Sequence, residues 1–155
     1  MAELKHTHLL MMELSVDFAG MKSIGQTPGG LRRIAPVTGG SFSGERLRGT
    51  VHGGADWVIN RPDGVMVIDV RLSLETGDGA LIYLTYQGRF LAEPEVMRRF
   101  GKGELLAPAE YSLAITAKFE CGDERYAWLN GVQAVATGAI VDAGAAVEYE
   151  VYRVL

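Results

Sequence analysis

The stretch VMVIDVRLSLE, residues 65–75, alternates between two kinds of side chain. Its even positions are aliphatic from Met66 to Leu74, and its later odd positions are polar or charged. Successive side chains of a strand point to opposite faces, so this period of two predicts a strand with one buried face. The polar positions of the stretch are Asp69, Arg71, Ser73 and Glu75.

Turn signals on both sides place this strand in an antiparallel meander. Arg61-Pro62-Asp63-Gly64 precedes it, and proline followed by Asp-Gly suits a tight turn after a strand at 56–60. Gly77-Asp78-Gly79 follows it and leads into a further strand at 80–86. The two turns predict three consecutive antiparallel strands.

Other segments repeat the pattern, and twenty glycines against five prolines indicate frequent turns. Residues 20–36 have poor periodicity and are interpreted as a long connection, with a role as a lid left open. One short helix is expected at 94–100, where proline lies in the first turn and Gly101 follows the end. Strands are expected at 10–18, 45–51, 111–120, 125–138 and 146–154.

The sequence therefore predicts an all-β protein: a single antiparallel β-barrel of about eight to ten strands with one short helix. Closure of the sheet avoids exposed strand edges. A chain of 155 residues suits one domain, covering 1–155.

Composition excludes several classes of function. Apolar residues make up 48% and charged residues 22%, as in soluble globular proteins, and no apolar stretch is long enough for a spanning helix. The net charge of −4 gives no reason to expect nucleic acid or an anionic membrane as a partner. With a lone Cys121 and no secretory signal, a cytoplasmic location is expected.

Several stretches together resemble the bacterial and fungal proteins grouped as domain of unknown function 3237. The resemblance rests on 38–49, 53–57, 69–71 with 78–80, and 119–120 with 125–130. It implies a small antiparallel β-barrel and brings little about function, because the family is largely uncharacterised. One departure is Ser112-Leu113-Ala114, where relatives have Tyr-Phe-Arg, so no role of that arginine carries over.

Three residues are candidates for acid/base chemistry. Asp69 and Arg71 are two positions apart and share a strand face; if that face lines the lumen, Arg71 would anchor a carboxylate or enolate oxygen while Asp69 orients it or moves a proton. The alternative is a surface stripe with a weak ion pair. Glu120 is a candidate general base if it is buried.

Both tryptophans lie beside polar residues, which suggests a pocket wall for a flat organic ligand, although ordinary core packing explains the same pattern. On an expected strand, Tyr126, Trp128 and Asn130 would share a face. No metal site and no cofactor are expected, since His6, His8 and His52 lack accompanying carboxylate spacing. The candidate ligand-binding residues are Arg46, Asp56, Trp57, Tyr126, Trp128 and Asn130.

The leading hypothesis for function is a barrel that binds a small apolar or aromatic metabolite bearing an acidic or carbonyl oxygen in its lumen. The alternative is a cofactor-independent acid/base enzyme, an isomerase, lyase or hydrolase, with Asp69, Glu120 or Asp56 as base. A third hypothesis is an assembly protein. A raised carboxylate pKa in the lumen would favour the enzyme, and a homodimer is compatible with each.

Overall fold

Residues 2–155 are described by a computed structural model, and they form nine strands, one α-helix and three short 3₁₀ segments. The strands are β1 (His6–Val16), β2 (Lys22–Thr27), β3 (Gly30–Ser43), β4 (Arg48–Asn60), β5 (Met66–Thr76), β6 (Leu81–Ala92), β7 (Tyr111–Glu120), β8 (Gln133–Val141) and β9 (Ala146–Val154). The helical segments are α1 (Pro94–Gly101), η1 (Pro108–Glu110), η2 (Glu124–Gly131) and η3 (Asp142–Gly144).

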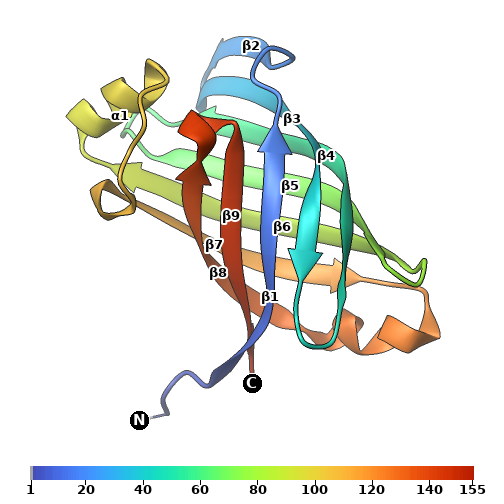
Figure 1. Ribbon diagram of the computed structural model, residues 1–155. Helices are drawn as coiled ribbons and strands as arrows, with labels where there is room; N and C mark the ends of the chain where they lie inside the picture. The colour runs from blue at the N-terminus through green and yellow to red at the C-terminus, as the bar shows by residue number, and fades with distance from the viewer. Residues whose placement is uncertain (1) are drawn as a thin grey trace.

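All nine strands belong to one antiparallel sheet in the order β1-β9-β8-β7-β6-β5-β4-β3-β2. A further pairing of β1 with β3 closes eight of them into a barrel and leaves β2 as an extra strand on β3 (Figure 1). The predicted all-β barrel with one short helix is confirmed. Helix α1 and the β2–β3 hairpin lie at one end of the barrel, and η2 lies at the other.

The seam between β1 and β3 depends on a glycine. Gly40 pairs with Leu14 and has a φ of 147°, in a region that side chains rarely adopt. A Cβ atom at this position would lie 1.9 Å from the carbonyl oxygen of Glu13. Only glycine therefore lets β3 approach β1 closely enough to close the sheet.

Alternation along each strand sends one set of side chains into the barrel. In β5 the even positions, including Leu72 and Leu74, are almost completely buried, while Arg71 and Ser73 are exposed. The interior of an eight-stranded barrel is narrow and is filled by side chains, so the aliphatic face occupies it. The most deeply buried large side chains are Phe90, Leu10, Met12, Leu14, Leu72, Leu74, Ile82, Leu84, Leu129, Val51 and Val70.

Helix α1 agrees with its predicted range. Pro94 stands in the first turn, and Glu95 lies near the positive end of the helix dipole. Arg98 and Arg99 lie in the last turn, near the negative end of the dipole, so the charges at both ends stabilise the helix. No helix within residues 2–155 is long and apolar enough to cross a membrane.

Three sequence-based predictions were wrong. The connection expected at 20–36 is the β2–β3 hairpin, because β2 is too polar and short to show a buried face. The strand expected at 125–138 begins only at Gln133; before it lies η2, started by Asp123, whose side chain accepts from the Arg125 backbone N–H. The strand expected at 45–51 begins at Arg48 and continues through Gly53 and Gly54.

Replacement of Leu74 by alanine tests the filled interior. Leu74 is fully buried, so Leu74→Ala is expected to lower the free energy of unfolding by about 2–5 kcal/mol in denaturant titrations. Ser73→Ala, one position away on the outer face, is expected to change it by no more than about 0.5 kcal/mol. Similar losses for the two variants would contradict the assignment of inner and outer faces.

Candidate functional site

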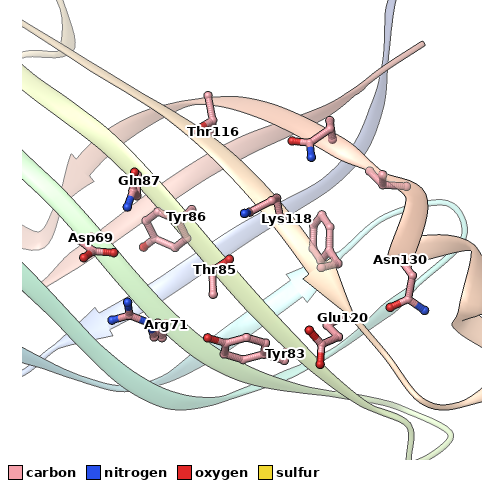
Figure 2. A pocket seen from close by; sticks show the side chains of 13 residues that line it. Asp69, Arg71, Tyr83, Thr85, Tyr86, Gln87, Thr116, Lys118, Glu120 and Asn130 are labelled. Atoms are coloured by element: carbon pink, nitrogen blue, oxygen red, sulfur yellow. The ribbon is translucent and has the colours of Figure 1, made fainter.

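The prediction that Asp69 and Arg71 face the lumen was wrong, because the even side chains of β5 occupy the interior. Asp69 and Arg71 instead lie on the outer face of the sheet, beside Tyr83 and Thr85 of β6 (Figure 2). Together with residues of β7 and β8 they line a concavity of about 750 Å³ that we call the outer groove.

The outer groove also contains two further candidates, Glu120 and Asn130 (Figure 2). Glu120 is exposed at the end of β7, so it does not meet the condition of burial that would make it a base. The Asn130 side chain accepts from the Cys121 N–H and donates to the Cys121 and Ala127 carbonyl oxygens. These bonds hold η2 against the end of β7. Roles of Asp69, Arg71 and Glu120 in chemistry remain predictions.

The aromatic candidates do not form one pocket wall. The Arg46 guanidinium lies 3.7 Å from the centre of the Trp128 ring, at the η2 end of the barrel. Trp57 instead lies against Arg71, whose guanidinium carbon is 5.1 Å from the centre of the Trp57 ring. The Tyr126 hydroxyl donates to the Asp78 carboxylate at 2.9 Å. Because η2 is not a strand, Tyr126, Trp128 and Asn130 do not share a strand face.

A second concavity lies inside the barrel, at the end near α1. We call it the end pocket; its volume is about 100 Å³, and its lining is almost wholly apolar. The polar side chains among its lining residues are those of Arg33, Asp56, Tyr86 and Tyr149. Asp56 is thus the one sequence-predicted candidate that lies in the lumen.

Asp56 interrupts the pairing of β4 with β5. The ladder runs to Asp56–Val70 and resumes at Ile59–Val67. In the interval the Asp69 N–H donates 3.1 Å to Oδ1 of Asp56, so a side chain replaces a backbone acceptor. Within residues 2–155, no hydrogen bond engages Oδ2.

The environment of Asp56 favours its neutral form. Desolvation by burial is the largest effect and raises the pKa of Asp56 to about 6; the Asp69 N–H and the charges of Arg33 and Arg32 oppose the rise. A carboxyl group with this pKa exchanges its proton near neutral pH.

Arg33 enters the same pocket from β3. It pairs with Val58, and Ala35 pairs with Asp56, so Arg33 and Asp56 are diagonal neighbours on adjacent strands. The Arg33 guanidinium donates to the Asn60 side chain, but its Nε is buried without a hydrogen-bond partner. No ion pair joins Arg33 to Asp56 within residues 2–155.

Two tyrosines complete the polar part of the end pocket. Tyr86 and Tyr149 are buried edge-to-face with ring centres 5.3 Å apart. Burial raises the pKa of each phenol above its usual value. Each phenol therefore stays protonated and can donate a hydrogen bond. Gly138 leaves space for the Tyr149 ring, because a Cβ atom at position 138 would lie 2.7 Å from that ring.

Comparison with known proteins identifies the family. Residues 6–154 match the family described as protein of unknown function (DUF3237). The chain belongs to this family. A UPF0311 protein from Rhodopseudomonas palustris is 32% identical over 117 residues, which are 75% of this chain and 76% of that protein.

Solved structures show the same barrel. A β-barrel-like protein from Acinetobacter baumannii is 35% identical, with a TM-score of 0.84 over 99% of this chain and 98% of that one. A conserved protein of unknown function from R. palustris is 28% identical, with a TM-score of 0.92 over both whole chains. An enzyme from Penicillium herquei is 22% identical, with a TM-score of 0.72 over 99% and 96%, a likeness that shows the fold alone.

In this DUF3237 protein, sequence reasoning missed Arg33, Tyr86 and Tyr149 as pocket residues. A signal for Tyr149 was present, since it alternates with Glu148 and Glu150 on an apolar face. The signal for Arg33 was weaker. Arg33 stands two positions before Ala35, which is the spacing of one strand face, but both residues lie in a segment interpreted as a connection. Ala114 is exposed on β7.

The raised pKa of Asp56 predicts a pH-dependent difference in stability between the protein and Asp56→Asn. Burial penalises the ionised form, so Asp56 destabilises the fold above about pH 6, and this effect disappears as the pH falls below the unfolded value of 3.8. The asparagine oxygen can still accept from Asp69. Denaturant titration is expected to show Asp56→Asn more stable by roughly 1–3 kcal/mol at pH 8, and by less than about 1 kcal/mol at pH 4. A pH-independent difference would contradict the burial argument.

Proposed function

We propose that this protein binds a small, mostly apolar organic molecule in the end pocket, with one oxygen of the ligand directed at Arg33 and Asp56. The observation that carries the proposal is the buried, unpartnered Nε of Arg33 in the same pocket as a carboxylate with a free oxygen. The other lining side chains are apolar, except for two tyrosines. Ligand sites combine such a lining with a few convergent polar groups.

The size of the pocket restricts the ligand. A cavity of about 100 Å³ is smaller than the usual ligand pocket of roughly 300–1,000 Å³. An apolar cavity of about 150 Å³ takes a benzene ring. The end pocket is smaller than this, so a molecule with a single small ring fits best.

The mouth of the end pocket is aromatic. Phe18, from the loop after β1, and Phe100 of α1 both line the pocket and lie near Gly144 of η3. Phe18 is also 47% exposed, which suits contact with an incoming apolar ligand.

The end pocket suits such a ligand better than the outer groove does. Side chains of the outer groove, such as Arg71 and Glu120, are exposed and already solvated. Electrostatic interactions with a ligand are weaker there, because water screens exposed charges. The buried Nε–H of Arg33, which has no partner, gains more from an oxygen acceptor.

A cofactor-independent acid/base enzyme is the second candidate, and the raised pKa of Asp56 favours it. A general base works best when its pKa lies near the operating pH. We propose that the protein is located in the cytoplasm. A homodimer is compatible with either function.

Ligand binding can be tested with three ketones of increasing size: cyclohexanone, phenylacetone and 2-indanone. We expect at least one to shift amide signals of pocket residues such as Ala35 and Gly144 in NMR titrations, while Thr85 and Thr116 of the outer groove stay unchanged. Ala35→Leu, which fills the pocket beside Asp56, should weaken this binding at least about tenfold.

Ala114→Leu provides the matched control, because Ala114 is exposed on the outer face of β7. It should bind the ketones as the unmodified protein does. Thermal unfolding of both variants verifies that each is folded. Shifts confined to the outer groove, or no shifts with any of the three ketones, would refute binding in the end pocket.

A further inference from the structure

We infer that the end pocket catalyses enolisation, with Asp56 removing a proton from the carbon next to a ligand carbonyl and Arg33 holding the carbonyl oxygen. This inference rests on the proposed function, since it names the reaction and the substrate class of the same pocket. The substrate class is a small ketone or related carbonyl compound with a C–H bond beside the carbonyl.

The placement of the two groups supports this division of roles. Arg33 and Asp56 lie diagonally across β3 and β4, so their Cα atoms are separated by about 7–8 Å. They do not pair with each other, and Nε of Arg33 and Oδ2 of Asp56 are both without partners within residues 2–155. Arg33 and Asp56 line the same pocket, so a carbonyl compound bound there lies within reach of both side chains.

The remaining polar groups of the pocket fit the same step. The hydroxyls of Tyr86 and Tyr149 are further donors for the oxygen of the substrate, and both phenols stay protonated because burial raises the pKa of each. Met66 and Val70 add apolar surface around the reacting atoms. Such a surrounding strengthens the interaction of Arg33 with developing negative charge.

The step is balanced without a cofactor. The Asp56 carboxylate forms an O–H bond with the proton, and the electron pair of the broken C–H bond becomes the carbon–carbon double bond of the enolate. The carbonyl π pair moves to oxygen, where the Arg33 N–H stabilises it. The protonated Asp56 carboxyl exchanges its proton with solvent. Return of a proton from Asp56, to the same carbon or to a conjugated one, restores the carboxylate and gives an exchanged or isomerised carbonyl compound.

A purely structural role of Asp56 is the competing explanation, because its Oδ1 replaces a backbone acceptor for Asp69. Asp56→Asn separates the two roles. The amide oxygen can still accept from the Asp69 N–H, whereas the amide cannot take a proton from carbon. A structural role alone would leave the chemistry of the asparagine variant intact.

The experiment follows hydrogen–deuterium exchange beside the carbonyl of cyclohexanone, phenylacetone and 2-indanone in D₂O by NMR, with binding measured in the same samples. For the ketone that binds, the protein is expected to accelerate exchange over buffer. Asp56→Asn should slow the catalysed rate about 10²–10⁴-fold while changing the half-saturating concentration less than about threefold. The rate should rise with pH to a plateau, half-maximal near pH 6, as Asp56 ionises.

Asp63→Asn, the same substitution in the exposed turn between β4 and β5, is the control and should keep the full rate. Binding of a ketone with equal exchange for the protein and Asp56→Asn would overturn the enolisation and leave the proposed binding function standing. Failure of all three ketones to bind would overturn both.

Discussion

Pairing of β1 with β3 is the contact on which the rest of this structure depends. It converts a nine-stranded sheet into a closed barrel and so creates an interior with two ends. Without it, the aliphatic faces of both strands would meet water, and the edges of the sheet would remain open. The close approach at Gly40 is therefore a condition for both the core and the end pocket.

Closure also explains why the two ends differ. Toward η2 the interior is filled by large aliphatic side chains such as Leu74 and Ile82, and Leu129 of η2 is fully buried. Toward α1 the lining includes small residues such as Ala35, and the polar groups of Arg33 and Asp56 take the place of packing side chains. The void and the unpaired polar atoms thus coincide, which is typical of a site kept for a ligand or for water.

Much of the fold was predictable because burial on one face imposes a period of two. That signal located β1, β5, β7 and β9 and the turns between β4 and β6. It failed where burial on one face is weak, as in β2, and where Tyr126, Trp128 and Asn130 imitate alternation within η2. In β5 the alternation was found, but its polar face was assigned to the lumen, although the volume of the lumen favours aliphatic side chains.

The site was only partly predictable, because its residues come from four strands that are far apart in sequence. Asp56 was found as a polar residue beside Trp57, yet its partner Arg33 lay in a segment interpreted as a connection. Spatial proximity of Arg33, Tyr86 and Tyr149 follows from strand order and barrel closure, neither of which a local pattern contains. The register of β3 against β4 is the missing information.

The interrupted ladder at Asp56 restricts which residues this position can accept during evolution. A hydrophobic side chain would fit the apolar surroundings but would leave the Asp69 N–H without an acceptor inside the sheet. Only residues that offer a side-chain oxygen close to the backbone satisfy it. Acidic and neutral acceptors can therefore alternate here among descendants of one ancestor without loss of the barrel. Gain or loss of a proton-transferring group would then need a single substitution.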